Sequence, residues 1–139
     1  MKYMLLMYGS QQDYDALTGS PAPGKAAWSP QEAAAMGAFM ESFGKDLAES
    51  GELVDAQGLT APVLARRIQL QGGVPVVTDG PYPETEEVLA GYWIVECGSF
   101  DRATEIASRL SDCPGPEYVR GVAKVDVRPI ADSRDDLEL

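Results

Sequence analysis

Apolar side chains follow two distinct periods along this chain. Residues 2–8 and 91–97 are apolar or aromatic at most positions, which is typical of strands buried on both faces. Residues 36–47 carry apolar side chains three and four positions apart and predict an amphipathic helix, and residues 100–110 repeat that pattern. Residues 122–128 alternate between apolar and charged side chains, as a half-exposed strand does.

Local signals mark the ends of both predicted helices. Ser29 is a favourable N-cap, and Glu32 completes an S-x-x-E capping box with it. Gly51 suits the left-handed position that follows a helix, so the first helix is expected to end there. The second helix is expected to begin after the cap Ser99 and to stop at the Cys-Pro-Gly-Pro run of residues 113–116.

The segments between these elements predict a short strand over residues 52–57 and a hairpin. Its arms, residues 64–70 and 74–78, meet at a tight turn that contains Gly72 and Gly73. Residues 9–28 are rich in Gly, Ser, Pro and Ala and predict a long connection. Such a connection is either a packed or mobile segment or a lid over a ligand, and the sequence leaves both open.

The order of elements is therefore strand, helix, strand, hairpin, strand, helix, strand. This is a ferredoxin-like α+β plan, β-α-β-β-α-β with an extra hairpin, in one domain over residues 1–130 with an acidic tail over 131–139. Two helices cover only one face of such a sheet, yet strands 2–8 and 91–97 are apolar on both faces. Because a monomer rarely exposes so large an apolar patch, we expect a homodimer that pairs the uncovered sheet faces.

The net charge of the chain limits the classes of macromolecule that it is expected to bind. The chain has 11 Lys and Arg residues against 22 Asp and Glu residues, a net charge of −11 in 139 residues. Such a field repels phosphate backbones and anionic lipid, so we expect neither nucleic-acid nor membrane binding. The sequence lacks the pattern of a secretory signal, and Cys97 and Cys113 fit no metal-binding spacing. We therefore expect a cytoplasmic protein with two free thiols.

Histidine is absent from the chain. This excludes Ser-His and Cys-His catalytic pairs and the commonest zinc ligand, so any acid-base chemistry falls to carboxylates, tyrosines or lysines. The chain has no dinucleotide or Walker phosphate-binding motif, and the acids of its tail do not follow a calcium-loop pattern. We therefore expect no cofactor and no metal.

The candidate site surrounds the turn Asp79-Gly80-Pro81 and the acidic loop that follows it to residue 87. An irregular acidic loop that leads into a buried aromatic strand is a reasonable place for a ligand cleft. Alternation along the strand places the side chains of Arg66 and Arg67 on opposite faces of the hairpin. The predicted ligand-binding residues are Tyr8, Arg66, Arg67, Tyr82, Tyr92, Trp93 and Arg128. The alternative is that the aromatic residues only fill the interior and that Asp79 only caps its turn.

Residues 79–87, followed by Gly91-Tyr92-Trp93, resemble the signature of the DGPF branch of YCII-related proteins. In that branch an Asp-Gly-Pro-Phe turn precedes an acidic run and a strand that opens with Gly and an aromatic residue. The resemblance covers nearly the whole chain, and its further matches are residues 2–6, 50–53, 58–59 and 127–129. It implies a dimeric α+β barrel of ferredoxin-like protomers. Tyr82 replaces the usual Phe, and Glu86 stands where Lys is common.

The resemblance also bears on function without fixing it. The wider YCII group is proposed to act through a His-Asp pair, which this chain lacks, and many members are encoded near extracytoplasmic-function sigma factors. Three functions follow as hypotheses. In the first, the chain is a homodimer that binds a small molecule in the cleft at Asp79. In the second, it is an isomerase or lyase for a small organic acid, in which Asp79 transfers the proton and Tyr82 or Tyr92 donates a hydrogen bond. In the third, it is an acidic interaction module linked to a sigma factor.

Overall fold

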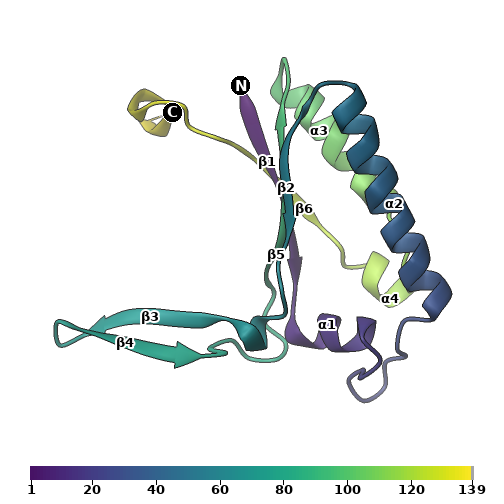
Figure 1. The fold of residues 1–139 in the computed structure, drawn as a ribbon, viewed down its shortest axis with the longest axis vertical. Helices are drawn as coiled ribbons and strands as arrows, with labels where there is room; N and C mark the ends of the chain where they lie inside the picture. The colour runs from purple at the N-terminus through teal and green to yellow at the C-terminus, as the bar shows by residue number, and fades with distance from the viewer. Residues whose placement is uncertain (139) are drawn as a thin grey trace.

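A computed structural model describes residues 1–138, and its centre is a four-stranded antiparallel sheet (Figure 1). The strands lie in the order β2-β5-β1-β6. Their bounds are Lys2–Gly9 for β1, Leu53–Gly58 for β2, Val88–Glu96 for β5 and Val125–Pro129 for β6. This is the strand order of a ferredoxin-like fold with a hairpin inserted between β2 and β5, so the predicted α+β fold class is confirmed.

Helices cover one face of this sheet (Figure 1). The capping box predicted at Ser29 is present, since its side chain accepts a hydrogen bond from the backbone of Glu32 and the Glu32 carboxylate accepts one from the backbone of Ser29. Gly51 follows the helix with a positive φ of 79°, as predicted. The helices are α1 (Gln11–Leu17), α2 (Pro30–Glu49), α3 (Phe100–Ser108) and α4 (Glu117–Arg120), with short 3-10 turns at Pro62–Leu64, Arg109–Asp112 and Arg134–Glu138.

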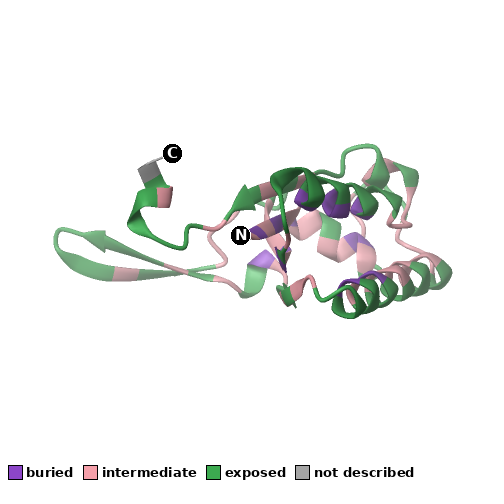
Figure 2. Cartoon of the chain, turned by 90° about the horizontal axis from the view of Figure 1, so that it is seen from above, coloured by how far each residue is buried: buried purple, intermediate pink, exposed green. Residues whose placement is uncertain are grey.

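The hydrophobic core lies between the sheet and helices α2 and α3 (Figure 2). Phe43 and Leu47 of α2 are buried against Leu5 of β1 and Val95 of β5. Trp93 extends from β5 into the same layer, where its ring meets that of Phe43 edge-on at a centroid distance of 4.9 Å. The core therefore depends on the apolar stripe of α2 that the sequence predicts.

The opposite face of the sheet carries apolar side chains that no described helix covers (Figure 1). Register places Met4 beside Ile94 and Leu6 beside Tyr92 on this face, and all four side chains are partly exposed. We call the surface formed by Met4, Leu6, Tyr8, Tyr92 and Ile94 the open face. Its composition agrees with the predicted apolar second face of the central strands.

The predicted hairpin forms a sheet of its own. Strands β3 (Arg66–Gln71) and β4 (Val74–Asp79) pair with each other and project from the body as an arm (Figure 1). Gly72 and Gly73 form the predicted turn with φ of 57° and 79°, values that L side chains rarely adopt. The first arm begins two residues later than predicted, because Pro62–Leu64 form a 3-10 turn before it.

The long connection predicted over residues 9–28 contains a helix in its first half, which the sequence analysis did not predict. Ser10 caps helix α1 and forms a second capping box with Asp13. Ala16 is buried, and the Tyr14 hydroxyl donates a hydrogen bond of 2.7 Å to the carbonyl of Leu59. These tertiary contacts hold a helix that is too short to be stable alone, so this part of the connection is packed.

The acidic tail contains one local structure. Residues Arg134–Glu138 form a 3-10 turn, and the Asp136 carboxylate accepts hydrogen bonds from the backbone of Asp132 and Ser133. Leu139, the last residue of the predicted tail, lies outside the described residues.

Candidate functional site

The hairpin separates the two arginines of the candidate site, as strand alternation predicts. Arg66 faces one side, where its Nε donates a hydrogen bond of 3.2 Å to Oδ1 of Asp79. Both side chains are largely exposed. Among the described residues, the Asp79 carboxylate makes this contact and no hydrogen bond to the turn backbone. It is solvated and paired, whereas a proton-transfer group in a closed site is shielded from water.

Arg67 faces the other side and lies against the loop. Its guanidinium stacks over the ring of Tyr82 at 4.7 Å from the ring centroid. The side chain is half-buried. Among the side chains of residues 1–137, no carboxylate lies close enough to Arg67 to form a salt bridge. The described contact of the Arg67 guanidinium is therefore the ring of Tyr82, although the chain contains 22 acids.

A cleft of about 340 Å³ lies beside Tyr82, at the base of the arm. Its walls come from the connection between β2 and β3, from the loop and from the start of β5. They are Leu59, Thr60, Ala61, Pro62, Ala65, Tyr82, Val88 and Leu89. The walls are mainly apolar, and Thr60 and Tyr82 are the residues among them with polar side chains; Arg67 stacks on the Tyr82 ring.

Backbone geometry brings the walls of this cleft together. Gly80 has a φ of 52°, and its N–H donates a hydrogen bond of 2.8 Å to the carbonyl of Ala65. A Cβ at Gly80 would lie 3.2 Å from the carbonyl oxygen of Val63, so glycine lets the turn approach the 3-10 segment closely. The Leu59 N–H bonds to the carbonyl of Ala90, which fixes the far wall to β5.

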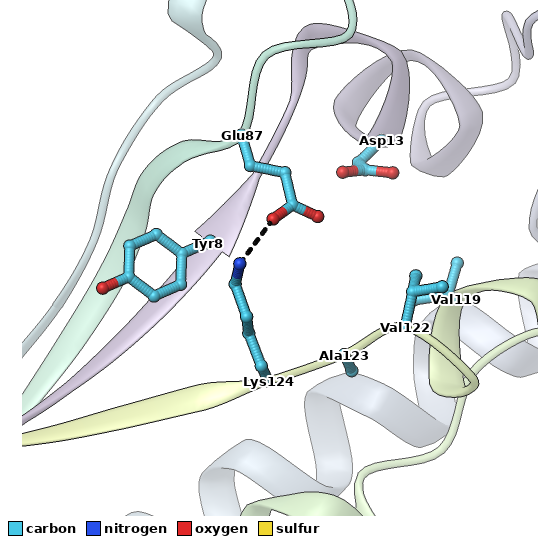
Figure 3. A pocket seen from close by; sticks show the side chains of 7 residues that line it. All are labelled: Tyr8, Asp13, Glu87, Val119, Val122, Ala123 and Lys124. Atoms are coloured by element: carbon cyan, nitrogen blue, oxygen red, sulfur yellow. Dashed lines mark ion pairs between the residues drawn. The ribbon is translucent and has the colours of Figure 1, made fainter.

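A smaller cavity of about 110 Å³ is lined by residues from β1, α1, α4 and the segments before β5 and β6 (Figure 3). Its lining consists of Tyr8, Asp13, Glu87, Val119, Val122, Ala123 and Lys124. Lys124 Nζ lies 3.3 Å from Glu87 Oε2 and 5.4 Å from the centroid of the Tyr8 ring. Its charged groups thus pair within the chain, and the cavity has room for only a very small molecule.

Two predicted tyrosines are bound to carboxylates on the open face. The Tyr8 hydroxyl donates a hydrogen bond of 2.7 Å to Asp126, and the Tyr92 hydroxyl donates one of 3.0 Å to Asp55. In each case the hydrogen bond to the carboxylate is the main cause that raises the pKa of the tyrosine above its usual value. Both tyrosines are therefore hydrogen-bond donors at neutral pH, and neither is among the residues that line the cleft beside Tyr82.

The remaining predicted residues lie elsewhere. Trp93 is on the helix-covered face, against Phe43, and does not share a surface with its neighbour Tyr92. Arg128 pairs with Met4 in the register of β6 and β1 and so belongs to the open face. The structure brings Arg67 and Tyr82 together at the cleft. The other cleft residues were missed because small apolar residues in a connection carry no chemical signal.

The family model for the YCII-related domain matches residues 1–131. The chain belongs to the YCII-related family. It is also similar to an uncharacterised protein of Rhizobium meliloti (strain 1021), with 30% identity over 105 residues, which is 76% of this chain and 81% of that protein. The YCII-related domain thus includes the sheet, the arm and both cavities. The match names the wider family, so membership of the DGPF branch stays a prediction.

Other features of this YCII-related chain limit its chemistry. Cys97 and Cys113 are both free, as predicted, and burial raises the pKa of the Cys113 thiol. Among the side chains that the structure describes, up to residue 137, no group of three acidic or cysteine side chains converges in a way that would hold a metal ion. None of the described helices is both long and apolar enough to cross a membrane.

Proposed function

We propose that this YCII-related protein is a homodimer that binds a small organic acid in the cleft beside Tyr82. The observation that carries the proposal is the half-buried Arg67, which has no acidic partner among the side chains of residues 1–137 and stacks on Tyr82, one wall of an apolar cleft. Ligand sites combine apolar walls with a few polar groups that fix orientation, and this cleft is at the small end of their usual size range.

The chemistry of Arg67 favours a carboxylate. One face of the guanidinium lies on the Tyr82 ring, which leaves the N–H groups at its edge free to bind two oxygens in one plane. Ala65, two residues before Arg67, contributes to the wall, and Leu59, Val88 and Leu89 offer aliphatic surface for the body of the ligand. We therefore expect a monocarboxylate with a compact apolar group.

The open face supports the homodimer. Met4, Leu6 and Ile94 are partly exposed on it, and helices α2 and α3 pack on the opposite side of the sheet (Figure 1). A second copy related by a two-fold axis removes this surface from water, since each copy presents the same face to the other. The acid-base alternative gains no such support, because Asp79 is solvated and paired with Arg66.

Titration calorimetry with a panel of small carboxylates tests the ligand. We expect benzoate or hexanoate to bind, and the matched neutral amides, benzamide and hexanamide, to bind at least tenfold more weakly. Arg67→Gln is expected to weaken carboxylate binding by a factor of about ten or more, because a charged hydrogen-bond pair contributes about 1.5–3 kcal/mol.

Arg66→Gln is the matched control. It removes the same charge from the adjacent residue, but that side chain faces Asp79 on the other side of the arm, so carboxylate affinity should stay within twofold of wild type. Equal losses in both variants, or no binding of any panel member at millimolar concentration, contradict the proposal.

A further inference from the structure

Helix α1 lies at the end of the sheet from which the arm projects (Figure 1). The residues that line the cleft beside Tyr82 include none from α1, yet hydrogen bonds connect this helix to both walls of the cleft. The first wall is the connection between β2 and β3, and the second consists of the acidic loop and the start of β5. The position of the two walls therefore depends on α1 as well as on the residues that line them.

Two side chains of α1 hold the first wall. The Tyr14 hydroxyl donates a hydrogen bond of 2.7 Å to the carbonyl of Leu59. Oε1 of Gln11 accepts one of 2.9 Å from the backbone N–H of Val63. Nε2 of Gln11 in turn donates a hydrogen bond of 2.9 Å to Asp15, and this contact fixes the amide so that its oxygen faces Val63. The connection is therefore bound to α1 at both Leu59 and Val63.

The same helix also contacts the second wall. The backbone N–H of Gln12 donates a hydrogen bond of 3.1 Å to the carbonyl of Glu84 in the loop. The Tyr14 hydroxyl lies 3.4 Å from the carbonyl of Ala90 in β5, and that carbonyl also accepts a hydrogen bond from the Leu59 N–H. Tyr14 therefore lies where the two walls meet. Burial raises the pKa of this tyrosine, so its hydroxyl stays protonated and remains a donor at neutral pH.

Helix α1 is itself fixed to the body of the protein. The capping box of Ser10 and Asp13 closes its first turn, and Ala16 is only 2% exposed. The carbonyl of Ala16 accepts a hydrogen bond of 3.1 Å from the N–H of Trp28. A fixed helix that bonds to both walls limits how far the walls move apart. A binding site gains affinity when its walls need no rearrangement to receive the ligand.

We propose that α1 holds the two walls of the cleft at a fixed separation, with Tyr14 and Gln11 as positioning residues, and that this separation sets a preference for carboxylates with a longer apolar group. The inference rests on the ligand of the proposed function and adds the residues that determine its selectivity. In that function Arg67 binds the carboxylate, which all ligands of the class share. The walls contact the apolar group, so displacement of a wall lowers affinity only for a ligand long enough to reach it.

Removal of one hydroxyl group tests this role. Tyr14→Phe should raise the dissociation constant of hexanoate at least about threefold, since one hydrogen bond is lost, and should change that of propanoate by less than about twofold. Tyr118→Phe is the matched control: this tyrosine is also half-buried, and its hydroxyl donates a bond of the same length, 2.7 Å, to the carbonyl of Ala26, which does not line the cleft. Chemical-shift titration by NMR measures both dissociation constants. Arg67→Gln, in contrast, should weaken the binding of both carboxylates.

Two glutamine variants provide a second test that does not depend on Tyr14. Gln11→Met removes the acceptor of the Val63 N–H and keeps the length of the side chain. Gln12→Met makes the same change at the adjacent residue, whose bond to the loop comes from the backbone and is kept. Hexanoate affinity should fall at least about threefold in Gln11→Met and stay within about twofold of wild type in Gln12→Met.

Amide hydrogen exchange measures the first wall in the absence of ligand. The N–H groups of Leu59 and Val63 bond to groups other than the Tyr14 hydroxyl, so their exchange rates report motion of the wall and not the loss of their own bonds. Both rates should rise at least about threefold in Tyr14→Phe and stay at the wild-type values in Tyr118→Phe.

The possible failures of this inference and of the proposed function are distinguishable. Equal losses of hexanoate affinity in Tyr14→Phe and Tyr118→Phe, or a loss for propanoate as large as that for hexanoate, overturn the inference and leave the ligand site intact. Unchanged exchange of the Leu59 and Val63 amides in Tyr14→Phe also overturns it. A wild type that binds neither carboxylate overturns the proposed function, and amide exchange then still decides whether α1 holds the walls.

Discussion

Replacing Phe43 with alanine is expected to lower the free energy of unfolding by about 3–5 kcal/mol, the usual cost of removing a fully buried phenylalanine. Phe43 is only 1% exposed and joins helix α2 to the sheet. Its ring meets Trp93 at 4.9 Å and Phe39 at 6.1 Å, and the Arg109 guanidinium lies 5.2 Å from its centroid. The truncation therefore leaves a cavity that three neighbouring side chains border and that rigid β5 cannot fill.

Urea unfolding followed by tryptophan fluorescence measures this loss, since Trp93 borders the cavity. All samples need one protein concentration, because association of folded chains adds to apparent stability. Phe39→Ala is the matched control: it removes the same atoms one turn earlier in α2, from a half-buried position. Its loss should be clearly smaller than that of Phe43→Ala. Equal losses show that Phe43 is not the centre of the core.

Local signals explain why much of the fold could be predicted. Ser29 and Gly51 delimit α2 through hydrogen bonds and φ values that involve only neighbouring residues. The Gly72-Gly73 turn likewise fixes the register of the arm without help from the rest of the chain. The order of the strands in the sheet can then be predicted, because a β-α-β-β-α-β sequence has one common antiparallel arrangement.

Helix α1 shows where such signals fail. Its capping box has Asp at the third helical position instead of the usual Glu, and Gly, Ser and Pro dominate the surrounding segment. What stabilises it is distant in sequence: the Tyr14 hydroxyl bonds to Leu59, and the Val63 N–H bonds to the Gln11 side chain. These contacts depend on the final position of the β2–β3 connection, which the sequence of α1 does not encode.

The sequence predicts the candidate site only where the alternation of side chains along a strand determines the face on which each residue lies. Period-two alternation correctly separates Arg66 from Arg67 and Tyr92 from Trp93. It does not show which side of each strand meets the helices or the loop. The pairing of Arg67 with Tyr82 depends on how the Asp79–Gly80 turn folds back on Ala65, and this is a tertiary contact.

Acidification is expected to remove a specific contribution of Glu52 to stability. Glu52 precedes β2, and its carboxylate accepts hydrogen bonds of 2.7 and 2.9 Å from Arg102 at the start of α3. These bonds, with a further one of 2.8 Å from Ser50, outweigh partial burial and lower the pKa of Glu52 from 4.5 to about 2. A bidentate pair of this kind ties the edge of the sheet to the helix that packs on it.

The direction of the pH dependence follows from the difference in the pKa of Glu52 between the folded and the unfolded chain. A carboxylate whose pKa is lower in the folded chain stabilises the fold above its unfolded pKa, here above about pH 4.5, and this stabilisation is lost as the pH falls toward 2. Because the Arg102 side chain is 45% exposed, solvent screens the pair, and we expect a contribution of about 1–2 kcal/mol at neutral pH. Glu52→Gln should therefore lower the free energy of unfolding by that amount at pH 6.

Urea unfolding of the wild type and Glu52→Gln at pH 6, 4, 3 and 2 measures the pH dependence. The difference between the two proteins should shrink steadily below pH 4.5 and nearly vanish at pH 2, because a protonated Glu52 resembles glutamine. Glu49→Gln is the control, since its contact with Lys45 is 4.0 Å long and exposed, and it should change stability by less than about 0.5 kcal/mol throughout. A difference for Glu52→Gln that stays constant from pH 6 to pH 2 means that the pair with Arg102 is not what Glu52 contributes, and that packing of the side chain stabilises this corner of the fold instead.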